Sequence, residues 1–170
     1  MKTILRSLLV ATLVAGTLQA GNITKQEALK IVTPFYQFLS GKVSAKEVQP
    51  SFDKDWKSYY GNGEKDYRTF KQTTGFLGNV FRKMVPNLKW DIIDTKMSGN
   101  TIIVRGEGSG TVAGPVFITS PVKKGKSFKI MSIDMHTIKN GKVVKTYHIE
   151  DYRTAFKQLG IVKPFKKAKK

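Results

Sequence analysis

The sequence predicts an α+β domain in which N-terminal helices pack on one face of a curved antiparallel sheet of at least four strands. Two observations carry this prediction. Helix-start motifs followed by apolar residues at helical spacing occupy the region just after residue 20, whereas apolar and polar residues alternate on both sides of Asn140-Gly141. Helices therefore come first, and strands joined by hairpin connections follow.

The first 20 residues have the layout of a secretory signal. Two basic residues precede an apolar run from Leu8 to Leu18, and small residues follow it. The run is too short to span a bilayer comfortably, and no cysteine is present for a lipoprotein anchor. We therefore expect a signal peptide over 1–20, one domain over 21–160, a basic disordered tail over 161–170, and a periplasmic or secreted protein without a transmembrane span in its mature chain. An uncleaved N-terminal anchor is the alternative.

The amino-acid composition limits the kinds of site and partner that this chain can have. The 170-residue chain has no cysteine, which excludes disulfides, thiolate metal sites and a cysteine nucleophile. Its formal net charge of +18 would attract nucleic acid, an anionic membrane surface or an acidic ligand. The lysines are scattered outside the run 163–170, and no nucleic-acid-binding signature accompanies them, so we do not expect nucleic-acid binding. No cluster of His, Asp and Glu has ligand spacing, and we expect neither a metal site nor a cofactor.

Two helices are expected near the N-terminus. Thr24 and Glu27 form a capping box, in which each side chain satisfies a free backbone N–H of the first helical turn. Pro34 should kink or restart the helix, and Gly41 should end it. The same capping pattern recurs at 44–47 and predicts a short second helix. The apolar positions that define the first helix are Leu29, Val32, Phe35, Tyr36 and Leu39.

The middle of the chain is less regular. Residues 51–66 show no clean period, so we expect a loop or broken helix whose aromatic residues, Trp56 and Tyr60 among them, either gate a pocket mouth or pack over the sheet. Apolar spacing then predicts a helix over 67–85 that Asp66 could cap and that contains Phe76. Strands follow over 88–97 and from 101 onward, separated by a turn at Gly99-Asn100, and a last short helix ends at Gly160.

The closing hairpin, 126–151, carries the candidate site. Asn140-Gly141 suits a two-residue type I′ turn, so Ile138 should face Val143 across the ladder. Continued counting puts His136 opposite Lys145 and Asp134 opposite Tyr147. Asp134, His136, Tyr147 and Asp151 are then expected on one sheet face, and His148 and Glu150 on the other.

Over residues 24–160 the chain resembles the SnoaL-like polyketide cyclase or ester cyclase family of the cone-shaped NTF2-like superfamily. The resemblance rests on the order of the elements and on the segments VPNLKW, GSGTVAGP, KGKSF and NGKVVKTYHIEDYRTAFKQLG. The resemblance implies an NTF2-like cone with a small-molecule pocket. It also implies a cofactor-free reaction in which an acidic residue takes a proton from a carbon next to a carbonyl, and a histidine holds the enolate. The acidic position falls on Asp151. Val112 stands where the family histidine follows Gly-Thr, so His136 could substitute, and Tyr147 stands where the family has tryptophan.

These considerations set the expected site. Asp151 and His136 are the catalytic candidates, and the expected ligand-binding residues are Tyr147, Asp134, Trp56, Tyr60, Phe76 and Val112. Asp151 could instead cap the last helix, and His136 could be a hydrogen-bonded structural residue. We expect either a cyclase- or isomerase-type enzyme acting on a carbonyl compound, or a non-catalytic periplasmic protein that binds a hydrophobic or anionic ligand. Homodimerisation through the exposed sheet face is also expected.

Overall fold

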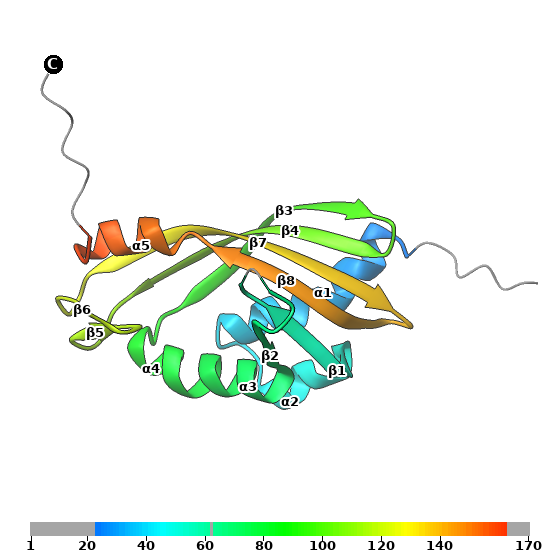
Figure 1. Ribbon diagram of the computed structural model, residues 1–170, viewed down its shortest axis with the longest axis horizontal. Coiled ribbons are helices and arrows are strands. Elements are labelled where there is room, and N and C mark those ends of the chain that lie inside the picture. The colour runs from blue at the N-terminus through cyan, green and yellow to red at the C-terminus, as the bar shows by residue number, and fades with distance from the viewer. Residues whose placement is uncertain (1–22, 62, 163–170) are drawn as a thin grey trace, which may run out of the picture.

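The computed structural model describes residues 23–61 and 63–162. The expected signal peptide and the tail from residue 163 lie outside this part of the chain. The described residues form the expected α+β cone, with a curved six-stranded sheet in the order β2-β1-β8-β7-β4-β3 (Figure 1). Its strands are β1 (Phe52–Tyr59), β2 (Tyr67–Thr69), β3 (Lys89–Ser98), β4 (Thr101–Thr111), β7 (Ser127–Lys139) and β8 (Lys142–Glu150). The β1–β8 pair is parallel and the other pairs are antiparallel.

The helices line the inside of the sheet, except for the C-terminal helix at one end of it (Figure 1). They are α1 (Lys25–Leu39), α2 (Ala45–Val48) with the 3-10 turn η1 (Gln49–Ser51), α3 (Phe70–Gly75), the π-helical turn η2 (Phe76–Phe81), α4 (Arg82–Met84) and α5 (Tyr152–Leu159). A small separate hairpin, β5 (Val116–Phe117) and β6 (Ser120–Pro121), belongs to the connection that joins β4 to β7 along the chain.

Both N-terminal capping boxes are present. The hydroxyls of Thr24 and Ser44 accept hydrogen bonds from the backbone N–H groups of Glu27 and Glu47, and the carboxylate of each glutamate accepts a bond from the backbone N–H of its cap residue. The restart considered at Pro34 does not occur, and α1 continues as one helix. Its buried face, which includes Val32, Phe35 and Tyr36, packs into the cone.

The region 51–69 differs from the sequence-based expectation. Residues 52–59 form strand β1 rather than a loop, and a register irregularity between Phe52 and Lys57 interrupts its alternation. Because of that irregularity, the apolar residues of this segment do not alternate regularly in the sequence. The helix expected from residue 67 begins only at Phe70, and its cap is Thr69, which accepts from the Gln72 N–H; the proposed Asp66 cap is therefore wrong.

Glycines in β4 make room for the Trp90 side chain of β3. The Trp90 ring of β3 lies so close to Gly108 that a Cβ there would stand 2.7 Å from it. At Gly106 a Cβ would meet both the Trp90 indole nitrogen and the Ser132 hydroxyl. Glycine thus lets a large indole lie flat against the inner face of the strand.

The closing hairpin has the expected turn but a different register. Asn140 and Gly141 have φ values of 49° and 72°, and Ile138 pairs with Val143 as counted. Val144 is then left as an extra residue, so Thr137 pairs with Lys145 and His136 with Thr146. This β-bulge inverts the facing of the rest of β8. The expectation that Tyr147 shares a face with Asp134 and His136 is wrong for that reason.

Among the described residues, no helix is both long and apolar enough to cross a membrane.

Candidate functional site

A cavity of about 70 Å³ lies inside the cone, between the concave sheet face and the helical segment 70–81. Its polar lining includes Asp134, His148 and Glu150 from the β7–β8 hairpin, Arg68 from the edge strand β2 of the same sheet, and Thr73 from helix α3. Its apolar lining includes Phe35, Leu39, Phe76, Leu77, Phe81 and Trp90. Pockets for drug-sized ligands measure roughly 300–1,000 Å³, so this cavity suits a small ligand.

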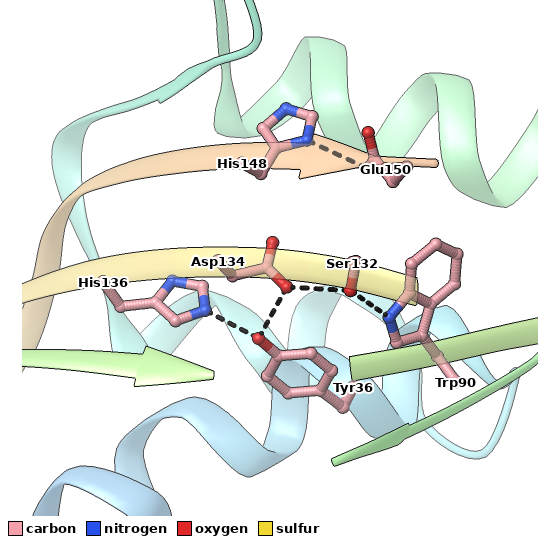
Figure 2. Close-up of polar contacts among 7 residues, drawn as sticks. All are labelled: Tyr36, Trp90, Ser132, Asp134, His136, His148 and Glu150. Atoms are coloured by element: carbon pink, nitrogen blue, oxygen red, sulfur yellow. Dashed lines mark hydrogen bonds and ion pairs between the residues drawn. The ribbon is translucent and has the colours of Figure 1, made fainter. Parts of the chain in front are cut away.

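Asp134 is the buried carboxylate of the cavity. Its side chain accepts hydrogen bonds from the Tyr36 hydroxyl at 3.0 Å and, at 3.4 Å, from the Ser132 hydroxyl (Figure 2). Burial, with the nearby charge of Glu150, raises the pKa of Asp134 from 3.8 to about 7; His148, Tyr36 and Ser132 act in the opposite direction. A carboxyl group with such a pKa exchanges protons near neutral pH.

A chain of buried hydrogen bonds fixes the proton positions next to Asp134. The Trp56 indole N–H donates to the Thr146 hydroxyl at 2.9 Å, and that hydroxyl lies 2.8 Å from His136 Nδ1. His136 Nε2 lies 2.9 Å from the Tyr36 hydroxyl, which donates to Asp134. Since the Tyr36 hydroxyl donates its hydrogen to Asp134, it accepts a hydrogen bond from Nε2–H of His136. Nδ1 of the neutral ring then accepts a hydrogen bond from the Thr146 hydroxyl. The chain therefore runs in one direction and ends on the ionised carboxylate.

Burial, together with the positive charge of His148, lowers the pKa of His136 to about 3. The imidazole is consequently neutral near pH 7, as the hydrogen-bond chain requires. Its place in that chain, with both ring nitrogens engaged by protein groups, makes it a positioning residue for Tyr36 and not a group exposed to the cavity.

A second donor chain reaches the same carboxylate. The Trp90 indole N–H donates to the Ser132 hydroxyl at 3.1 Å, and Ser132 donates to Asp134 (Figure 2). Both chains begin at an indole donor and end on Asp134. They stabilise the charged form of a group that burial would otherwise neutralise.

His148 and Glu150 face the cavity, because the bulge at Val144 moves them to the inner side of β8. The expectation that they lie on the other face is therefore wrong. His148 Nδ1 is 2.9 Å from the Glu150 carboxylate. Burial acts to lower the pKa of His148, but the hydrogen bond and charge of Glu150, with the charge of Asp134, raise it above its usual value. His148 is thus a proton donor inside the cavity.

Asp151 and Tyr147 lie outside the cavity. Asp151 is exposed and caps α5, accepting a hydrogen bond from the Thr154 N–H at 3.0 Å. That bond lowers the pKa of Asp151, contrary to the rise we expected from burial. Tyr147 is 43% exposed on the outer sheet face, where its ring lies 4.9 Å from that of Tyr59.

The other expected residues divide by position. Phe76 lines the cavity, and Trp56 is fully enclosed at the start of the donor chain. Tyr60 is half exposed, with its ring 6.3 Å from the ring of His148. Val112 is buried in the core but is not part of the cavity lining. The sequence analysis missed Tyr36, Ser132, His148, Glu150, Arg68 and Thr73; only Tyr36 carried a signal, as a polar-tipped member of the apolar stripe of α1.

Within the described ranges, no group of three His, Cys, Asp or Glu side chains is placed to hold a metal ion.

Comparison with known families agrees with this geometry. The model of the SnoaL-like polyketide cyclase family matches residues 33–159. The chain belongs to this family. Membership supports a cyclase- or isomerase-type function on a small-molecule substrate.

Solved structures with the same fold include three examples of low sequence identity. A SnoaL-like protein from Jannaschia sp. CCS1 is 14% identical, with a TM-score of 0.68 over 81% of this chain and 94% of that one. IdmH from Streptomyces antibioticus is 20% identical, with a TM-score of 0.66 over 80% and 99% of the two chains. A protein with a ketosteroid isomerase-like fold from Catenulispora acidiphila DSM 44928 is 14% identical, with a TM-score of 0.61 over 78% and 94%. A search of the curated proteins gave no significant match.

The pKa of Asp134 gives a test through stability. A carboxyl whose pKa is raised on folding stabilises the fold below its unfolded pKa, and this contribution is lost as pH rises toward about 7. Asp134→Asn removes this dependence. The variant should therefore gain thermal stability relative to wild type as pH rises from about 4 to about 7, approaching at most about 4 kcal/mol at 1.4 kcal/mol per pKa unit.

Thermal unfolding across this pH range measures the difference, with Asp151→Asn as the exposed control that should leave the wild-type profile unchanged. Parallel profiles for wild type and Asp134→Asn would contradict the raised pKa.

Proposed function

We propose that this SnoaL-like protein is a cofactor-free enzyme that removes a proton from a carbon next to a carbonyl group, with Asp134 as the general base. The observation that carries the proposal is a cavity-lining carboxylate whose pKa of about 7 lies near the working pH, where general-base catalysis is most efficient. Asp151, the candidate from the sequence, is the alternative base, and the experiment below separates the two.

The reaction requires little beyond the residues of the cavity. The Asp134 carboxylate accepts the proton, and the electron pair of the broken C–H bond moves onto the carbonyl oxygen to give an enolate. His148, whose charged form is favoured by Glu150, is the cavity group suited to hydrogen-bond that oxygen. The enolate carbon then attacks a second carbonyl, as in cyclisation, or is reprotonated elsewhere, as in isomerisation, and Asp134 returns its proton to the product.

A second candidate function is a non-catalytic pocket protein that binds a hydrophobic or anionic ligand. Val112 favours it, since the position that the resemblance assigns to a histidine holds a buried hydrocarbon side chain. In that case the Asp134 network would serve only to position a ligand.

Proton exchange separates these functions. The wild-type protein should accelerate deuterium incorporation next to the carbonyl of a small ketone in D₂O, with a rate that rises as pH passes through about 7. Asp134→Asn should lower that rate by roughly 100-fold or more, because an amide cannot accept the proton. NMR of the ketone signals measures both.

Asp151→Asn is the matched control and should exchange at the wild-type rate, since asparagine caps a helix about as well as aspartate. Loss of exchange in Asp151→Asn with a normal rate in Asp134→Asn would overturn the assignment. Tight ligand binding with no exchange in any form would favour the pocket protein.

We also propose that the chain is exported to the periplasm or secreted, on the basis of the basic and apolar pattern of residues 1–20. Intact-mass analysis of the envelope fraction should give a dominant species that lacks this segment. A dominant species that begins at Met1 would reject cleavage.

A homodimer formed through the outer sheet face is the assembly we propose. Met131, Met135, Tyr147 and Ile149 are 41–69% exposed there, and Met135 pairs with Tyr147 across the β7–β8 ladder. Such an apolar patch suits a self-complementary interface between two copies.

Light scattering should accordingly give a dimer for wild type and a monomer for Ile149→Lys. Val116→Lys, which changes an exposed apolar residue of the β5–β6 hairpin, should stay dimeric. A monomeric wild-type protein would contradict the proposal.

A further inference from the structure

Arg68 lies at the cavity wall in an unusual environment. Its guanidinium carbon lies 4.7 Å from the centre of the Phe76 ring and 4.9 Å from that of the Tyr60 ring. Two aromatic rings thus hold the side chain, each contact being favourable for a cation over a π-face. Within residues 23–61 and 63–162, no carboxylate lies within ion-pairing distance of the Arg68 guanidinium, and no side-chain hydrogen bond engages that group. Its donors are therefore available to a ligand.

Thr73 supplies a second polar group without a partner. Its side chain is 7% exposed and lines the cavity, and its hydroxyl is the one buried side-chain polar atom in the described residues that lacks a hydrogen bond. The adjacent Thr74 behaves differently, since its hydroxyl donates to the Phe70 carbonyl at 2.8 Å. An unpaired buried hydroxyl costs about 1–3 kcal/mol. A ligand that pairs with Thr73 would recover that cost.

The charges of the cavity place the anion-binding end next to Arg68 and Thr73. On strands β7 and β8, Glu150 is paired with His148, and Asp134 accepts hydrogen bonds from Tyr36 and Ser132. The positive charge of Arg68 extends into the cavity, where it opposes the rise in the pKa of both His148 and Tyr152. The cavity thus holds both a base, Asp134, and a cation without a carboxylate partner, Arg68.

We propose that Arg68 and Thr73 form an anion-binding subsite, so that the natural ligand is a small carbonyl compound bearing a carboxylate. Arg68 binds the carboxylate by charge-assisted hydrogen bonds, and Thr73 donates its hydroxyl hydrogen to a ligand oxygen. The carbonyl part rests on the proposed function, because Asp134 must face an acidic C–H, whereas the anionic part rests only on Arg68 and Thr73.

The test compares two probes, 4-oxopentanoate and its methyl ester, which differ only in the charge of one end. NMR titration of the full chain should show that wild type binds the carboxylate about tenfold or more tightly than the ester. Arg68→Met should reduce the affinity for the carboxylate to that for the ester, and leave the ester affinity unchanged. Arg68→Lys, which keeps the charge but not the planar fork, should retain part of the preference.

Matched controls separate the subsite from the overall positive charge. Arg105→Met removes the same charge from an exposed residue of β4 and should keep the full preference. Thr73→Val should weaken carboxylate binding without lowering the melting temperature, because the lost hydroxyl has no protein partner, and Thr74→Val should bind like wild type. The melting temperature of each variant shows that the fold is intact.

Equal affinity for the two probes in wild type, binding of neither, or the same loss in Arg105→Met as in Arg68→Met would overturn the subsite. Asp134→Asn should keep the preference for the carboxylate. If no form exchanges protons but the preference persists and depends on Arg68, the proposed function fails and the subsite stands. If exchange depends on Asp134 but the two probes bind equally, the subsite fails and the function stands.

Discussion

Asp134 is buried inside the cone, and hydrogen-bond donors from several strands and a helix converge on it. A carboxylate inside a protein is costly unless hydrogen-bond donors compensate for the lost water. Two donor chains supply them, one from Trp56 through Thr146, His136 and Tyr36, the other from Trp90 through Ser132. The chains tie α1, β1, β3, β7 and β8 to one carboxyl group. The inner layer of the cone is therefore arranged around a group that sits close to its titration point.

This arrangement accounts for features that packing alone would not require. His136 is fully buried, burial keeps its ring neutral, and protein hydroxyl groups engage both of its ring nitrogens. Gly106 and Gly108 lack side chains because the Trp90 ring must lie against β4 to bring its N–H to Ser132. The same side chains that form the core thus set the proton positions of the site.

The site also explains why family membership leaves the ligand open. One fold hosts many activities, and specificity resides in the side chains that line the cavity. In this chain the position assigned to a family histidine is Val112, buried outside the cavity, while His148 comes from another strand and faces into it. Arg68 of β2 and Thr73 of α3 also line the cavity. The ligand of this protein therefore depends on these side chains, which the fold alone does not fix.

The elements that could be predicted correctly from the sequence are those that interactions between neighbouring residues specify. Thr24-Glu27 and Ser44-Glu47 satisfy backbone donors within one helical turn, and Asn140-Gly141 accepts positive φ, so these elements could be predicted from a few adjacent residues. The fold class and family followed from their order. Asp134 and His136 were correctly expected to share a face, because they lie two residues apart on one strand.

The composition of the site was decided by tertiary structure. The bulge at Val144 arises where β8 pairs with β7 and β1 at once, and no local signal marks it. Because successive side chains of a strand point to opposite faces of the sheet, this single extra residue turns His148 and Glu150 toward the cavity and Tyr147 away from it. Likewise, the sequence allows Asp151 to be either the catalytic acidic residue or the N-cap of the last helix. Only the position of α5 leaves it in solvent as a cap. The pKa of Asp134 depends on burial and on partners as distant in sequence as Tyr36, which no local pattern can specify.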